Sequence, residues 1–123
     1  MFQGVLIAES LRVDAELKVD GLRCRRVVRR DVSATTAPTQ PGVWTFMDFD
    51  APDEMADALS AALATALEKE VGWYADFAAG DDHVVVFANR IFRYRRGDRA
   101  GREAAQAHGR SVGVPEHQLD WTE

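Results

Sequence analysis

The stretch GWYADFAAGDDHVVVFANRIFRYRRG, residues 72–97, decides the fold of this chain. It contains both Tyr residues and three of the six Phe residues of the sequence. Turn residues at 80–82 and 88–90 divide it into three short strands. Strands joined by such short turns pair as antiparallel hairpins. The unbroken apolar run Val84–Phe87 predicts the centre of the core.

A second hairpin pattern precedes this stretch. Apolar residues alternate with charged ones over 11–19, which is typical of a half-buried strand. The Asp-Gly pair at 20–21 is a strong signal for a tight turn. We therefore expect a strand over 11–19 that pairs with a return strand over 22–32.

The return strand carries five arginines. The expected register places Cys24 on the inner face opposite Leu17, where a cysteine behaves as a small buried hydrophobe. Arg26 and Arg30 fall on the same apolar face. We therefore expect either a β-bulge in this strand or an end that extends beyond the core.

Three further segments complete the sheet region. Residues 5–7 predict an edge or partly buried strand, and residues 43–49, apolar on both faces, predict a central strand. The proline-containing segment 33–42, which follows the return strand and precedes the strand over 43–49, predicts a loop.

Two helices are expected. Leucines and a methionine recur every four residues over about 52–70, with Asp50 placed to cap the helix and Gly72 to end it. Asp98 caps a second helix over about 98–112, whose inner face consists of small residues. Gly109 in this helix costs about 1 kcal/mol relative to Ala.

The order of these elements predicts an α+β fold in a single domain, 1–123. The sheet is mainly antiparallel and built from hairpins, because the strands do not alternate with helices. We expect both helices to pack on one face of this sheet.

Composition restricts the functional class. The net charge of −5 argues against a general nucleic-acid binder. Residues 22–32 carry +4 and residues 90–102 carry +5, so the rest of the chain carries −14. No apolar run is long enough to span a membrane, and the first residues do not resemble a signal peptide. Together with a single cysteine, these features predict a cytoplasmic protein.

The C-terminal part of the chain resembles small uncharacterised bacterial proteins. The similar residues are WYADF at 73–77, VVFANRIFRY at 85–94, Gly97-Asp98 and the ending GVPEHQLDW at 113–121. The resemblance covers roughly the last 50 residues. It implies a shared fold and assigns no activity or catalytic residue.

No catalytic or metal-binding signature is found. The spacings of His83, His108 and His117 match no metal motif, and we interpret these histidines as solvated or locally hydrogen-bonded. The acidic residues around the start of the first helix could hold a divalent cation, although capping and the helix dipole already explain most of them. We expect no cofactor.

The best candidate surface lies at the basic end of the 84–96 hairpin. Arginine beside tyrosine suits stacking and bidentate contacts with anions, and Asp76 could pair with Arg93 or Arg95 across the sheet. The residues of this candidate binding surface are Trp73, Tyr74, Asp76, Arg90, Arg93, Tyr94 and Arg95.

Three functions are compatible with this surface. The first is a non-enzymatic binding module, either a homodimer or a protein that binds an acidic partner. The second is a small enzyme for an anionic or phosphorylated metabolite, with His108 or Asp76 as base. The third is a nucleic-acid-binding module, which requires that the two arginine runs converge on one face.

Overall fold

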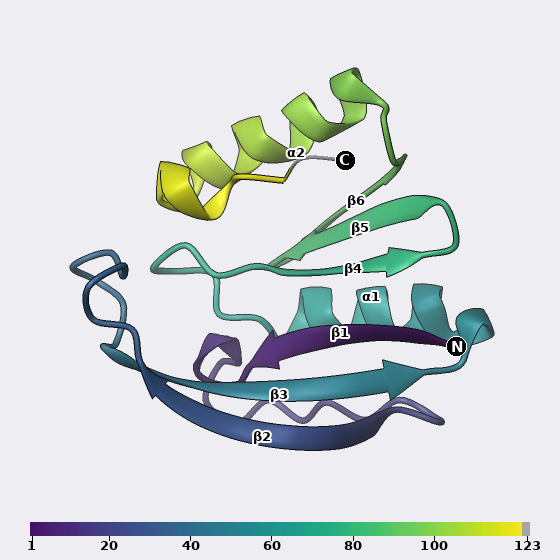
Figure 1. The fold of residues 1–123 in the computed structure, drawn as a ribbon, viewed down its shortest axis with the longest axis horizontal. Helices are drawn as coiled ribbons and strands as arrows, with labels where there is room; N and C mark the ends of the chain where they lie inside the picture. Colours follow the sequence, from purple (N-terminus) through teal and green to yellow (C-terminus); the bar gives the residue numbers. More distant parts are fainter. Residues whose placement is uncertain (122–123) are drawn as a thin grey trace.

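The chain forms one six-stranded antiparallel sheet with the strand order β2-β3-β1-β4-β5-β6 (Figure 1). The computed structural model describes residues 1–121. The strands are β1 (Phe2–Ile7), β2 (Arg23–Asp31), β3 (Val43–Ala51), β4 (Ala75–Ala79), β5 (Asp82–Phe87) and β6 (Arg90–Arg95). Two helices, α1 (Ala56–Ala66) and α2 (Arg99–Ser111), accompany the sheet. The α+β fold and the hairpins over 75–95 are thus confirmed.

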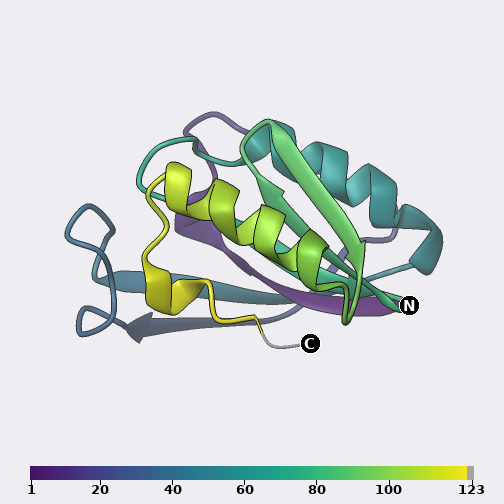
Figure 2. The ribbon, with the colours of Figure 1, turned by 90° about the horizontal axis from the view of Figure 1, so that it is seen from above.

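The helices lie on opposite faces of the sheet, so the expectation of a shared face is wrong. Val84 and Val86 of β5 belong to the core cluster that contains Leu59 and Leu63 of α1. Val85 and Phe87 belong to a second cluster with Ala105 of α2. Because successive strand residues point to opposite faces, β5 lies between the helices (Figure 2). The continuous apolar run over 84–87 reflects burial on both sides.

Residues 11–19 are not a strand, contrary to expectation, although the expected turn at 20–21 is present. The segment has no regular secondary structure apart from an isolated bridge between Leu11 and Leu67, and Asp14 has a positive φ of 68°. Leu11, Leu17 and Val19 of the alternating set still pack against the core cluster of α1 and the sheet, whereas Val13 is 84% exposed. Alternation therefore indicated the buried side of this segment only in part, and it gave no information on strand pairing.

The arginine-rich strand pairs with β3 in place of the 11–19 segment. Arg23 aligns with Asp50, and the register shifts between Cys24 and Arg26, so the irregularity that was one of the two expected alternatives occurs, here in the pairing with β3. Cys24 is exposed, so its expected burial is wrong. The reason is that β2 is an edge strand, and no strand within residues 1–121 pairs with its outer side.

Helix α1 is shorter than the expected 52–70. A 3-10 turn at Asp53–Met55 precedes it, and after Ala66 the backbone becomes extended at Leu67. Glu68 N–H then bonds to the carbonyl of Ser10, which directs the chain away from the helix. Asp50 does not cap this helix, because it lies inside β3 and is buried against Arg23 and Arg25.

Helix α2 begins and ends as expected. The Asp98 carboxylate accepts a hydrogen bond from Gly101 N–H. At the other end, Gly113 has a φ of 91°, and Val114 N–H bonds to the Gly109 carbonyl, which is the Schellman arrangement. The buried small residues are Ala105 and Gly109.

The first arginine run lies on the edge strand β2, and the second begins on the other edge strand, β6, and continues into the start of α2. Five strand spacings separate these edges, which is roughly 24 Å. The runs therefore form two separate basic edges and do not converge. Charged side chains on edge strands oppose pairing with strands of other molecules.

Candidate functional site: an aromatic groove with acidic residues

The sheet divides the predicted binding surface into two groups. Tyr74 and Tyr94 pack with the cluster beneath α2. Arg93 lies opposite Val84 on β5 and contacts Asp57 of α1, so it belongs to the other face. Residues 90, 93 and 95 are exposed, whereas Trp73 and Tyr94 are buried.

Three arginines of the basic hairpin, Arg90, Arg93 and Arg96, have partners within the chain, and Arg96 donates to the Gly80 carbonyl at 3.1 Å. Arg93 donates from Nε to Asp82 Oδ2 at 2.8 Å and from Nη1 to Asp57 Oδ1 at 3.1 Å. The hydrogen bond to Asp82 raises the pKa of Arg93 above its usual value. The Arg90 guanidinium lies 4.7 Å from the ring centroid of Phe92, a cation–π distance. These contacts neutralise part of the basic edge.

Trp73, Tyr74 and Asp76 instead line a groove of about 350 Å³ on the opposite face from α1. We call this the aromatic groove. Its lining residues are Val5, Ile7, Trp44, Phe46, Gly72, Trp73, Tyr74, Ala75, Asp76, Gln118 and Asp120. They come from β1, β3, the start of β4 and the C-terminal segment. Figure 2 shows that β2 and β3 extend beyond α2, which leaves this part of the sheet uncovered.

Aromatic side chains form much of the groove. The rings of Trp44 and Trp73 lie 5.1 Å apart at an angle of 59°, and Trp44 also contacts Phe46. Trp44 Nε1 donates to the Pro41 carbonyl, which fixes the orientation of its ring. Val5 is 45% exposed although it lies on a central strand.

A hydrogen-bonded network holds one carboxylate at the groove. His83 Nε2 lies 2.8 Å from Asp76 Oδ2, and His83 Nδ1 lies 2.6 Å from the Tyr94 hydroxyl. A tautomer that donates to Asp76 and accepts from Tyr94 satisfies both contacts. His83 is buried and not solvated, and it is hydrogen-bonded, which was the second of the two expected states for the histidines. The turn is short enough that residue 83 already belongs to β5.

This network fixes the position of the Asp76 carboxylate. Both ring nitrogens of His83 have partners within the protein, Asp76 and the Tyr94 hydroxyl. The Asp76 side chain is 39% exposed. The carboxylate can therefore contact a molecule in the groove while His83 fixes its position.

The charged residues that line the groove, Asp76 and Asp120, are both acidic, so the electrostatic potential there is negative. Burial, together with the charges of Asp76 and Asp120, raises the pKa of the Tyr74 phenol to about 12. The Tyr74 hydroxyl donates to the Gln118 carbonyl, which ties the C-terminal segment to the groove wall. A cation is the kind of ligand that this field attracts.

The other candidate residues lie elsewhere. His108 packs against Phe87 and Phe92 and lines a cavity of about 90 Å³, enough for about three water molecules. His117 contacts the carbonyl of Thr35. Within residues 1–121, no group of three or more His, Cys, Asp or Glu side chains is arranged to hold a metal ion.

Sequence reasoning found three of the eleven lining residues of the groove, namely Trp73, Tyr74 and Asp76. The sequence predicts a central strand over 43–49 that is buried on both faces. Trp44 and Phe46 are instead partly exposed. One feature of the sequence could have revealed these residues: more strand faces are apolar than the two helices can cover. Strands β1 and β3 carry apolar residues on both faces. Helix α1 covers one face, and the other face lines the groove.

Comparisons with known proteins found no matching family model, no matching curated protein and no matching solved structure. No helix within residues 1–121 has the length and apolar character needed to cross a membrane. The function must therefore be argued from the groove itself.

Proposed function

We propose that this chain is a binding module that holds a basic segment of a partner protein in the aromatic groove. The observation that carries the proposal is the combination of Trp44, Trp73 and Tyr74 with the carboxylates of Asp76 and Asp120 along one groove. Aromatic faces attract ammonium and guanidinium groups by about 0.5–2 kcal/mol. A carboxylate adds a charge-assisted hydrogen bond.

The shape of the site favours a peptide over an enclosed small molecule. The groove is open along the uncovered face of β1 and β3, and a chain segment can lie across such a surface. The net charge of −5 favours approach of a basic partner at low salt. This ligand class differs from the acidic partner expected for the basic hairpin. Binding of an acidic partner by Arg95 and its neighbours stays a prediction.

A tetra-arginine peptide amide tests the proposal directly, with a tetra-citrulline peptide as the neutral isostere. We expect the arginine peptide to bind saturably and to shift the indole NMR signals of Trp44 and Trp73. The citrulline peptide should bind at least about tenfold more weakly, which corresponds to about 1.4 kcal/mol. Arginine amide alone serves as a small-cation probe and separates peptide recognition from simple cation binding.

Matched variants distinguish the groove from general charge attraction. Asp76→Asn and Asp120→Asn should each weaken binding of the arginine peptide by several-fold, whereas Asp81→Asn changes the net charge equally at an exposed turn. Equal affinity for the two peptides would exclude the proposal. An equal loss in the Asp81→Asn protein would show that only net charge matters.

A further inference from the structure

A second hollow lies on the opposite face of the same strands. It has a volume of about 330 Å³, and we call it the apolar cavity. Its lining residues are Leu6, Leu11, Leu17, Leu22, Cys24, Met47, Phe49, Leu59 and Leu63. Eight of these nine side chains are purely apolar or thioether in character, and the ninth is a thiol. The volume falls within the range of natural ligand pockets, about 300–1,000 Å³.

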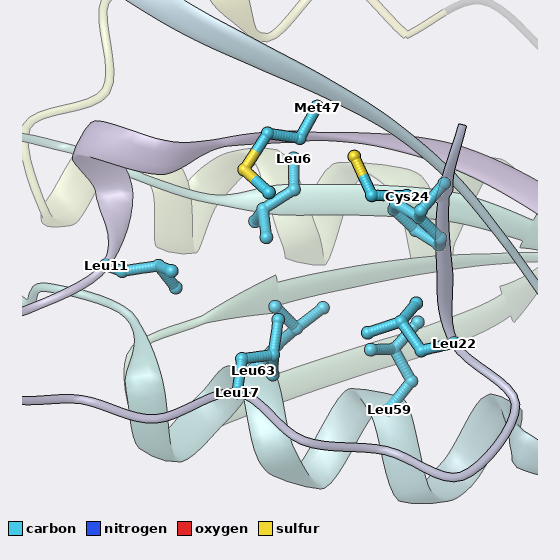
Figure 3. A pocket seen from close by; sticks show the side chains of 9 residues that line it. Leu6, Leu11, Leu17, Leu22, Cys24, Met47, Leu59 and Leu63 are labelled. Atoms are coloured by element: carbon cyan, nitrogen blue, oxygen red, sulfur yellow. The ribbon is translucent and has the colours of Figure 1, made fainter. Parts of the chain in front are cut away.

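Three elements form the walls of the apolar cavity (Figure 3). Leu6, Met47 and Cys24 project from the sheet, and Leu59 and Leu63 project from α1. The third wall is the irregular segment 11–22 with its inward-facing leucines. The cavity thus lies between a rigid sheet, a rigid helix and a segment that lacks regular secondary structure.

The irregular segment is attached firmly near its two ends. Arg12 N–H donates to the Ala66 carbonyl at 2.9 Å, and Arg12 Nε donates to the Thr65 carbonyl at 3.0 Å. At the other end, Gly21 lies so close to Pro52 that a Cβ there would be 2.7 Å from the proline ring. Between these points the segment contacts the core mainly through Leu17 and Val19. This wall of the cavity is thus fixed near its two ends and is packed between them through these two side chains.

We infer that the apolar cavity binds a small aliphatic molecule. An apolar cavity of about 150 Å³ is already large enough to bind benzene, and this one is more than twice that volume. An unfilled apolar cavity lowers stability in proportion to its volume, so a ligand that fills it stabilises the fold. The thiol of Cys24 is exposed, which places the mouth of the cavity beside β2.

The linear alcohols from n-butanol to n-octanol are suitable probes. We expect affinity to rise about fourfold for each added methylene until the cavity is full, and to rise no further beyond that length. The methyl NMR signals of Leu6, Met47 and Leu63 should shift, whereas the indole signal of Trp44 should not. The aromatic groove and the apolar cavity occupy opposite faces of β1 and β3, so the two sites give separate spectral changes.

A cavity-filling variant tests the location. Cys24→Phe places a ring at the mouth of the cavity, and Ile91→Phe adds a ring at an exposed position on the opposite edge strand. We expect Cys24→Phe to raise the Kd of n-octanol at least about tenfold and Ile91→Phe to leave it unchanged. Equal affinity in the wild-type and Cys24→Phe proteins would overturn the inference.

A measurement on the wild-type protein keeps the inference testable if the variant does not fold. The rate at which a thiol-reactive dye modifies Cys24 should fall as n-octanol saturates the cavity. An unchanged modification rate at saturating alcohol, or the lack of any saturable binding, would also overturn the inference.

Discussion

His108 is the residue whose surroundings give the clearest pH dependence. It is half-buried on α2 against Phe87 and Phe92. Burial first, and then the positive charge of Arg90, lower the pKa of His108 below 6.5. The folded protein therefore binds fewer protons at this position than the unfolded chain over a pH range below about 6.5.

This difference predicts a loss of stability in acid. The contribution of His108 is fully present above pH 6.5, and it is lost as the pH falls from that value through the folded-state pKa. Urea unfolding between about pH 7.5 and about pH 5.5 measures the change. We expect His108→Gln to lose less stability over this range than the wild type does. His117→Gln is a control at an exposed histidine, and a larger loss in His108→Gln would contradict the assignment.

At the residue scale, the sequence predicted which residues lie at the site better than it predicted their hydrogen-bond partners. Trp73, Tyr74 and Asp76 do lie at one site. Asp76 pairs with His83, however, and not with the expected Arg93 or Arg95. Alternation along a strand gives the face of each residue, but the partner depends on which residues stand opposite in the neighbouring strands.

Helix α2 is the element whose packing depends most on glycine. A Cβ at Gly101 would lie 2.5 Å from Tyr94 Cβ, and one at Gly109 would lie 2.7 Å from the tip of Leu119. The glycines thus allow close approach of α2 to β6 and to the C-terminal segment. This contact explains why the sequence retains glycine at a cost in helix propensity.

We expect Gly101→Ala to lower the free energy of unfolding by roughly 1–3 kcal/mol, because Tyr94 Cβ cannot move without the backbone of β6. Gly109→Ala should be nearly neutral, since the Leu119 side chain can move. Chemical denaturation measures both changes. Ala104→Gly, at an exposed position of the same helix, should cost about 1 kcal/mol. A Gly101→Ala protein more stable than the wild type would show that α2 does not pack this closely.

At the element scale, the sequence predicted the 75–95 hairpins and the ends of α2 because local turn and cap residues specify them. It could not predict β1 as the central strand between β3 and β4, because that pairing is non-local. The 11–22 segment shows the same limit. Its pattern reflects contact with α1 and the sheet, and a pairing register cannot be derived from burial alone. The apolar cavity depends on this segment and was therefore not predicted.

The distribution of charge acts on the molecule as a whole. Both edge strands carry arginines, while the rest of the chain is acidic. Exposed backbone groups on an edge strand can pair with a second molecule, and charged side chains oppose this association. Arg29 and Arg30 are exposed on β2, so they are suitable positions for a test.

Replacement of both residues, Arg29→Thr and Arg30→Thr, changes the net charge from −5 to −7. Arg99→Gln with Arg102→Gln makes the same change on α2. If net charge controlled association, both proteins would repel more strongly and remain dispersed. If the edge arginines act locally, only the β2 variant associates, because Thr favours strand pairing. We expect the second result by size-exclusion chromatography with light scattering. The same measurement on the wild type tests the expected homodimer, and a β2 variant that associates no more than the wild type would remove the protective role of the edge arginines.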